Sequence, residues 1–283
     1  MRVPPLPAGR LEVRATNLTM KTVRSYLSLL LAYMRVNWRS ALEYRTNFLF
    51  ESILSVVEIG MYLFYWRIFF DISGGIPGTT YEQLAALVAF NHIIYAGADT
   101  LMGNHVWDTV ELITKGQLDT FLVQPKSAVF QLFFSGAQPM RAIQIVIGVA
   151  LYFTFVTATP AGVALLLFGF IIGTAIFSAW LVAIHSLTFR LGNSVVVYKL
   201  LSVILHFAKK PAGIFSFAIR MILYTVIPAA YLGTVQAEQV FAPDPLVIAG
   251  LTVLAVAAPL GAARLFRNGM RLYESGNLIG VRM

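Results

Sequence analysis

Residues 161–188 read AGVALLLFGFIIGTAIFSAWLVAIHSLT, a run without a single Asp, Glu, Lys or Arg. About 20 apolar residues are enough for a helix to cross the hydrocarbon core of a bilayer, so this stretch predicts a membrane-spanning helix. The whole 283-residue chain has the same character, since 58% of its residues are hydrophobic and only 12% are charged. A soluble domain carries about 25% charge. With no Cys, the composition excludes a soluble globule, a disordered chain, a disulfide-linked secreted domain and a thiolate metal site.

Five further apolar stretches predict membrane spans of the same kind. Each must be helical, because lipid offers no hydrogen-bonding partner to backbone amides. No repeat of about ten alternating residues, which a membrane β-barrel would need, occurs along the chain. We therefore expect an all-α membrane protein with a transmembrane domain over residues 47–264. The six predicted spans cover about 47–70, 83–103, 129–157, 161–188, 193–208 and 245–264.

The distribution of Lys and Arg predicts the orientation of the spans. Basic residues precede the first span at Arg24, Arg35 and Arg39 and follow the last at Arg264 and Arg271. This pattern places both termini in the cytoplasm and requires an even number of crossings. The net charge of +8 does not indicate nucleic-acid binding, because the basic residues lie in short clusters between apolar runs.

The segments outside the spans follow from the same rule. Residues 71–82 are acidic and rich in Gly and Pro, which places this loop outside, whereas residues 104–127 contain Lys115 and Lys126 and are expected inside. Residues 1–20 lack the apolar core of a signal peptide and are expected to form a flexible cytoplasmic tail. Residues 265–283 form the C-terminal cytoplasmic tail.

Two interpretations remain open for residues 199–236. In the preferred one, residues 193–208 are the fifth span and residues 212–236 form a re-entrant helical pair broken at Pro228. In the alternative, Lys199–Arg220 lies at the inner surface and Met221–Gln236, with some upstream residues, is the fifth span. The positive-inside rule favours the alternative. Both interpretations give six crossings.

A helix of another kind is expected before the first span, over residues 21–46. Leu27, Leu31, Met34, Trp38 and Leu42 recur at helical spacing and form one apolar stripe. Arginines lie beside this stripe, so the segment predicts an amphipathic helix lying in the membrane interface. A seventh span is less favourable, because burial of an arginine near the bilayer centre costs roughly 2.5–3.5 kcal/mol.

Several ionisable residues interrupt the first two spans. Glu51 and Glu58 lie on one polar stripe of the first, and His92 and Asp99 are seven residues apart on the second. In an antiparallel hairpin Glu58 would lie at the depth of His92, and Glu51 at the depth of Asp99. Arg45 and Arg141 lie at about the same depth as Glu51 and Asp99 and can neutralise these two acids. Two interpretations remain open: these residues line a transport pathway, or they are a structural pair between helices.

Nothing in the sequence predicts an enzyme or a metal centre. No third group orients a catalytic base or nucleophile, and residues 120–237 contain no Asp or Glu for paired-carboxylate catalysis or a carboxylate metal site. The chain also lacks a Gly-x-x-x-x-Gly-Lys-Ser/Thr loop, so any ATP and Mg²⁺ must be bound by a partner.

The inner loop carries the most specific motif. Residues 113–125 read ITKGQLDTFLVQP, which resembles the Ile-x-x-Gly-x-Leu-Asp-x-x-Leu-x-x-Pro signature of the ABC-2 type transporter permeases. Residues 44–48 (YRTNF), 211–215, 220–228 and 269–276 (GMRLYESG) fit the same six-span bacterial subgroup. The likeness extends over nearly the whole chain from about residue 20.

The resemblance implies the subunit organisation of an exporter. It implies an interfacial elbow helix, six spans, a cytoplasmic coupling helix between spans two and three, and a re-entrant helical pair between spans five and six. Two copies of a separate ABC ATPase subunit and a second permease, identical or paralogous, would complete the complex in the bacterial inner membrane. The resemblance places the ATPase contact in or beside a short set of loop residues, namely Gly116, Gln117, Leu118, Asp119 and Pro125.

Two functions follow as hypotheses. The first is the permease subunit of an ATP-driven exporter that forms half of the translocation pathway. The alternative is an ion-coupled secondary transporter that uses Glu58, His92 and Asp99 as proton carriers. The sequence lacks the internal repeat of broken helices that many secondary transporters contain. The transported substrate does not follow from the sequence.

Overall fold

The structure is a computed structural model that describes residues 8–43, 45–103, 105–191, 199, 203, 206–225 and 228–273. Within these residues every regular element is a helix, apart from an isolated bridge between Ile76 and Thr79. Four helices are long and apolar enough to cross a membrane, and a bent helix pair makes a fifth if it is counted as one span. The prediction of an all-α membrane protein is confirmed. The sixth crossing stays a prediction, because residues 193–208 lie largely outside the described part of the chain.

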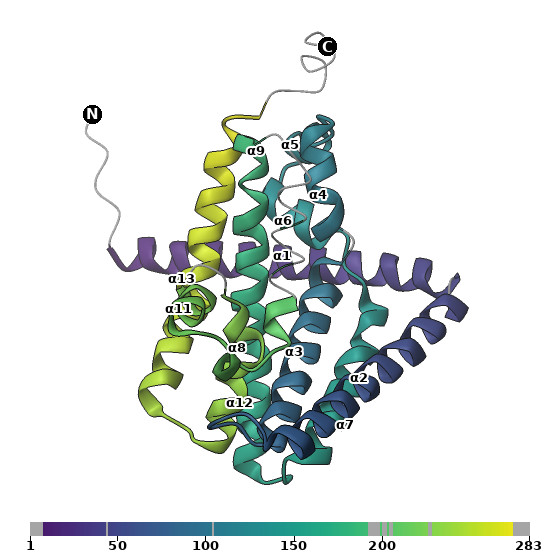
Figure 1. Ribbon diagram of the computed structural model, residues 1–283. Coiled ribbons are helices and arrows are strands. Elements are labelled where there is room, and N and C mark those ends of the chain that lie inside the picture. The colour runs from purple at the N-terminus through teal and green to yellow at the C-terminus, as the bar shows by residue number, and fades with distance from the viewer. Residues whose placement is uncertain are drawn as a thin grey trace, which may run out of the picture.

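The helices α2 (Arg45–Ser73) and α3 (Tyr81–Met102) form a hairpin whose turn lies at the end of the molecule opposite α4 and α5 (Figure 1). Gly74, Gly75 and Gly78 carry the chain through this turn with positive φ angles. Thr80 then caps α3, because its hydroxyl accepts a hydrogen bond from the backbone N–H of Gln83 at 3.2 Å. These two helices correspond to the first two predicted spans.

The centre of the bundle is α3, which packs along α7 (Ala142–Phe155) and α8 (Pro160–His185). Small residues allow this close packing, as they do in other membrane helices. A Cβ atom at Gly148 of α7 would collide with the Ile93 side chain, and one at Gly173 of α8 would collide with Ile94. The backbones of the three helices therefore approach more closely than larger residues would permit.

The third predicted span is broken. The short helix α6 (Ala128–Phe134) is followed by the 3-10 turn η1 (Pro139–Arg141), and the axis bends by 57° before α7. Pro139 has no N–H to continue a helix, and the backbone N–H of Gln138 donates to the carbonyl of Thr100 on α3 at 3.1 Å. The bend directs the first residues of α7 toward α2 and α3.

The helix α13 (Pro245–Met270) lies along α8 and, with the short α9 (Thr188–Leu191), completes one side of the bundle (Figure 1). Proline begins both long helices, where a missing N–H costs nothing. Thr159 caps α8 and Asp244 caps α13 through hydrogen bonds to backbone N–H groups at 3.0 and 2.8 Å. These helices correspond to the fourth and sixth predicted spans.

The region before α13 consists of short pieces: η2 (Ala212–Ile214), α11 (Phe217–Thr225), η3 (Pro228–Leu232) and α12 (Thr234–Phe241). Each is far shorter than the about 20 residues that a crossing requires. The segments η3 and α12 pack against α3 and α8. This arrangement favours the re-entrant interpretation over a continuous span at 221–236.

The first helix, α1 (Ala8–Glu43), lies across the bundle, with its axis at a large angle to α8 and α13 (Figure 1). It begins upstream of residue 21, where the sequence predicted its start. Leu27, Leu31 and Trp38 of the predicted apolar stripe are exposed on it, whereas Met34 is half-buried. Arg24, Arg35 and Arg39 are also exposed. Tyr44 and residues 1–7 lie outside the described residues.

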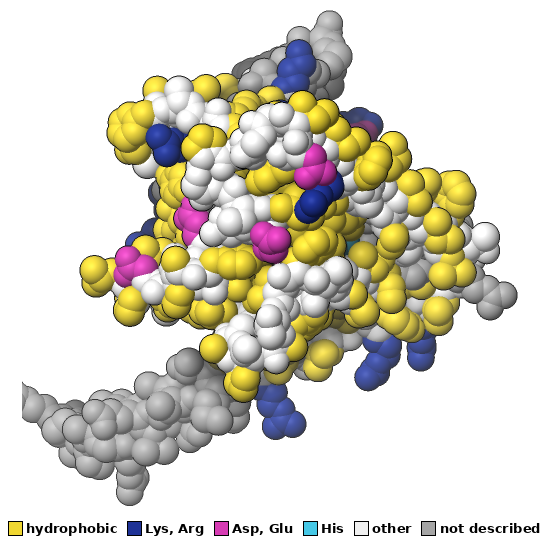
Figure 2. Space-filling model, turned by 60° about the horizontal axis from the view of Figure 1, so that its bottom comes forward, with side chains coloured by type: hydrophobic (Ala, Val, Ile, Leu, Met, Phe, Trp, Pro, Cys, Tyr) yellow, Lys and Arg dark blue, Asp and Glu magenta, His cyan; other side chains and the backbone are white. Residues whose placement is uncertain are grey.

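Hydrophobic side chains also dominate the surface seen in Figure 2, where charged groups are few and scattered. Extended exposed apolar areas of this kind mark contact with a membrane or with another protein surface. The surface therefore agrees with the assignment of a multi-pass membrane protein.

Candidate functional site

A polar cavity of about 480 Å³ lies between α2, α3 and α7. Its walls collect most of the ionisable residues that interrupt the predicted spans, together with amide and hydroxyl groups. The residues that line it are Glu51, Leu54, Ser55, Glu58, Asn91, His92, Tyr95, Ala96, Asp99, Arg141, Gln144, His206 and Lys209.

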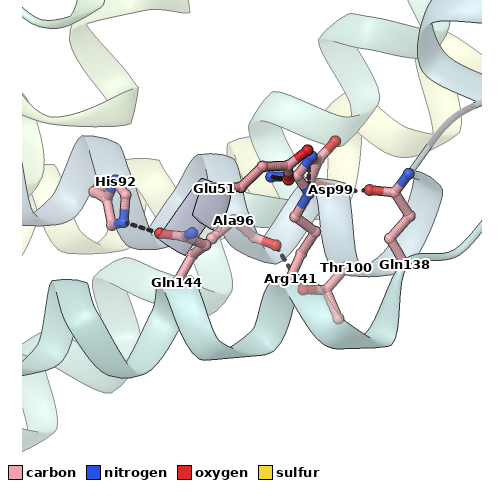
Figure 3. A network of polar contacts seen from close by, with 8 residues as sticks. All are labelled: Glu51, His92, Ala96, Asp99, Thr100, Gln138, Arg141 and Gln144. Carbon is pink, nitrogen blue, oxygen red and sulfur yellow. Dashed lines mark hydrogen bonds and ion pairs between the residues drawn. The ribbon is translucent and has the colours of Figure 1, made fainter. Parts of the chain in front are cut away.

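Arg141 joins the two acids near one end of this cavity (Figure 3). Its Nη1 lies 3.0 Å from a carboxylate oxygen of Glu51, and its Nε lies 3.4 Å from Asp99 and 3.1 Å from the amide oxygen of Gln138. Only 14% of the Asp99 side chain is exposed. An unpaired carboxylate at such a site would be costly, so the single guanidinium stabilises both acids between the helices.

Glu58 and His92 line the same cavity, but each has a different partner. The Nε2 of His92 lies 3.0 Å from the amide oxygen of Gln144 on α7 (Figure 3), and Glu58 forms an ion pair with Lys209 at 2.7 Å. The predicted Glu58–His92 contact is therefore replaced by two others. The reason is that α7 packs along α3 far more extensively than α2 does. The side chain of Arg45, the other predicted neutralising residue, lies outside the described part.

The predicted coupling segment, residues 104–127, folds as α4 (His105–Thr114) and the single turn α5 (Asp119–Leu122) at one end of the molecule (Figure 1). Gly116 ends α4 as predicted, with a φ of 69° in the left-handed region that favours glycine. Val110, Ile113 and Leu118 point inward and belong to the main hydrophobic core. The segment is therefore held firmly against the bundle.

The residues predicted for a partner contact divide into two groups. Leu118 is completely buried, with an exposed fraction of 0%, so it anchors the segment and is not available on the surface. Gln117 and Pro125 are exposed, and Gly116 and Asp119 are half-buried. The most prominent apolar side chain here is Val123, which is 83% exposed and which the sequence reasoning did not single out. We name Leu122, Val123 and Pro125 the coupling tip.

An aromatic cluster lies beneath the segment. Phe266 of α13 contacts Phe133 of α6 and Phe189 of α9, with ring centroids 5.2 and 5.1 Å apart, and Phe189 contacts Tyr273 at 6.4 Å. Burial, together with the nearby carboxylate of Asp119, raises the pKa of Tyr273 above its ordinary value of 10.0. The cluster thus connects the segment to the end of α13.

The segment is also fastened to α1. The Nζ of Lys126 donates to the backbone carbonyl and hydroxyl of Ser25 at 2.6 and 2.7 Å, and it lies 5.2 Å from the ring centroid of Tyr26. Farther along α1, Tyr33 donates to Gln131 at 3.3 Å and Asn37 donates to the carbonyl of Ser135 at 2.8 Å. The sequence analysis did not predict these contacts between α1 and residues 126–135. The polar residues Tyr26, Tyr33 and Asn37 recur on one face of α1, and this pattern could have indicated them.

Thus the described chain combines lipid-compatible helices, an ionisable cavity between three of them and a packed loop that exposes an apolar tip. The family model described as ABC-2 family transporter protein matches residues 56–276, most of the chain and nearly all of these features. The chain belongs to the ABC-2 transporter family. This ABC-2 protein is therefore a membrane transport permease, and the prediction of its family is confirmed. No curated protein and no solved structure shows significant similarity to it. The matched region starts after α1 and Glu51.

Proposed function

We propose that this ABC-2 protein is the permease subunit of an ATP-driven exporter, energised by two copies of a separate ABC ATPase. The observation that carries the proposal is the coupling tip, an exposed apolar patch on a segment whose Val110, Ile113 and Leu118 are buried in the core. An apolar patch that is held rigidly at one end of a membrane protein is suited to a groove on a soluble partner. ATP and Mg²⁺ would bind to that partner.

The contacts around the coupling segment offer a route for mechanical coupling. A displacement of the tip would act through Leu118 on the core and through Lys126 on α1. Close packing transmits such displacements because protein interiors yield little. The ends of α3, α8 and α13 would then move together with the segment.

The charge distribution supports an orientation with this end in the cytoplasm. Lys115, Lys126 and Arg190 lie on or near the segment, and Arg267 and Arg271 lie at the end of α13. Cytoplasmic regions of membrane proteins carry an excess of such residues. We propose that both termini are cytoplasmic and that the membrane is the bacterial inner membrane.

We further propose that the pathway forms where two permease subunits meet along α2. Only 11% of the most apolar stretch of α2 is buried within the chain, so most of its surface is left for lipid or a second permease. Glu51 and Glu58 of this helix face the polar cavity. A second subunit, identical or paralogous, would place the cavity beside the shared interface.

The contacts of the acidic residues make the ion-coupled alternative less favourable. Asp99 forms an ion pair with Arg141, and Glu58 forms one with Lys209. A carboxylate that carries protons must break such a pair each time it takes up a proton, so these contacts oppose the role. ATP-dependent transport in vesicles containing the purified complex would support the exporter. Transport driven by a proton gradient without nucleotide would support the alternative.

Copurification with the ATPase tests the role of the coupling tip. We expect Val123→Asp to abolish the association while the permease remains folded, because this side chain is exposed. Leu246→Asp is the matched control, since Leu246 is also 83% exposed but lies in the first turn of α13 at the opposite end of the molecule. An unchanged association of the Val123→Asp protein would contradict the proposal. Leu118→Asp is unsuitable, because it would place a charge in the core.

A further inference from the structure

A second cavity, of about 580 Å³, lies between α6, α8 and α13 and shares no lining residue with the polar cavity. Its walls are largely apolar and include Phe130, Phe170, Val182 and Pro259. Its volume lies within the range of about 300–1,000 Å³ that is usual for small-molecule sites. An apolar cavity of this size is suited to a hydrocarbon chain.

The cavity is long and follows the axis of α8. Phe170 and Val182 both line it, and their separation of twelve residues corresponds to about 18 Å along a helix. One leaflet of a bilayer contributes about 15 Å of hydrocarbon. An acyl chain that extends along α8 from the end near α9 would therefore reach about the middle of the membrane.

Two hydroxyl groups distinguish this cavity from a purely apolar groove. Thr174 and Ser178 are four residues apart on α8 and both line it, and among the described residues neither hydroxyl oxygen has a hydrogen-bond partner. Thr174 is only 6% exposed. In membrane helices such hydroxyls usually bond to a carbonyl of the preceding turn. Both hydroxyl oxygens are covered by neighbouring atoms, so these residues add polarity to the wall of α8 without presenting a hydroxyl to a ligand.

Charge complements the apolar walls at one end of the cavity. Arg267 of α13 lines the cavity and is exposed, with its Nε donating to the carbonyl of Ala263 at 3.2 Å. No acid neutralises it from the walls, because α6, α8 and α13 contain no Asp or Glu. The nearest acid on α3, Asp99, is paired with Arg141. The guanidinium is therefore available for an anionic headgroup.

We infer that this cavity binds an anionic phospholipid of the cytoplasmic leaflet, in the orientation proposed above. One acyl chain lies along α8 between Val182 and Phe170, and the phosphate-bearing headgroup pairs with Arg267. The lipid would fill the space between α8 and α13 and join them to α6. This site does not depend on the ATPase or on the polar cavity.

Native mass spectrometry of the delipidated full-length protein tests the site. The protein is titrated with dioleoylphosphatidylglycerol or with dioleoylphosphatidylcholine, and the fraction carrying one lipid is measured. We expect about fivefold tighter binding of the anionic lipid, since one basic residue near an anionic lipid contributes about 1 kcal/mol. Arg267→Gln should remove this preference without affecting the fold, because the side chain is exposed.

Two further variants make the result specific. Arg264→Gln removes an exposed arginine one turn away that does not line the cavity, and it should retain the preference. Ala175→Trp should fill the cavity and weaken the binding of both lipids. Equal binding of the two lipids by the wild-type protein would overturn the inference, as would an Arg267→Gln protein with the wild-type preference or equal losses in both arginine variants. None of these outcomes bears on ATPase association, so the two proposals can fail separately.

Discussion

The guanidinium of Arg141 lies 3.0 Å from the carboxylate of Glu51, and this contact joins the start of α7 to α2 across the polar cavity. The same side chain reaches Asp99 on α3 at 3.4 Å. One residue thus fixes the relative positions of three helices at the end of the cavity nearer α1. The bend before α7 places it there.

Arg141→Gln should destabilise the protein. It leaves two carboxylates without a cation in a partly buried site, which we expect to cost about 2 kcal/mol, less than the 3–5 kcal/mol of a fully buried pair. Denaturant unfolding of the purified protein measures this change. Arg67→Gln is the control, because its ion pair with Asp71 is more than half exposed and should contribute less than about 1 kcal/mol. Equal effects of the two variants would contradict the bridging role.

Glu58→Gln should reduce transport while the complex still assembles. The substitution keeps the size of the side chain but removes the charge that faces Lys209 in the polar cavity. Transport by reconstituted complexes is the measurement, with copurification of the ATPase as the check on assembly. Wild-type transport by a fully assembled Glu58→Gln complex would show that the residue has only a structural role.

Gly116→Ala should loosen the coupling segment. The φ of 69° at Gly116 is unfavourable for any residue with a Cβ, and the cost is about 1 kcal/mol. Gly116→Asn should be milder, because asparagine tolerates this conformation better. Gly250→Ala, within α13 and with open space around it, should be neutral or slightly stabilising. Hydrogen exchange of residues 105–122 would report the difference, and equal protection in the Gly116→Ala and wild-type proteins would refute it.

Lys126→Met should release α1 from the bundle. The ammonium group donates two short hydrogen bonds to Ser25, and charged hydrogen bonds of this kind contribute about 1.5–3 kcal/mol. Limited proteolysis or hydrogen exchange within residues 22–43 should reveal faster opening. Lys115→Met removes a lysine of the same segment whose one ion pair among the described residues is with the exposed Glu111, and it should leave α1 protected. Similar behaviour of both variants would argue against the anchor.

Stability should decrease at high pH, in part through Tyr273. Because burial and Asp119 raise its folded-state pKa, the folded protein retains the phenolic proton longer than the unfolded chain does. The stability from this group is complete below its ordinary pKa of 10.0 and is lost as the pH rises above that value. Tyr273→Phe keeps the ring beside Phe189 and should make the decline shallower. Identical pH profiles for the two proteins would contradict this assignment.

The amino-acid sequence by itself determined the features that depend on local composition. Unbroken apolar runs specify membrane helices such as α8. In lipid the backbone N–H and C=O groups of such a run find hydrogen-bond partners only within a helix. The motif from Ile113 to Pro125, together with the other matching stretches in order, indicated the family that the match over residues 56–276 establishes. Gly116 was correctly predicted as a helix end, because a left-handed terminus depends only on the residue that adopts it.

Only the tertiary structure decided which side chains meet. Sequence spacing paired Glu58 with His92 through hairpin geometry, but α7 supplies Gln144 to His92, and Lys209 reaches Glu58 instead. The family resemblance placed Leu118 in or beside a partner contact, whereas packing buries this residue and exposes Val123. Periodicity records which residues share a face of one helix. Which element covers that face depends on contacts between segments far apart in the chain.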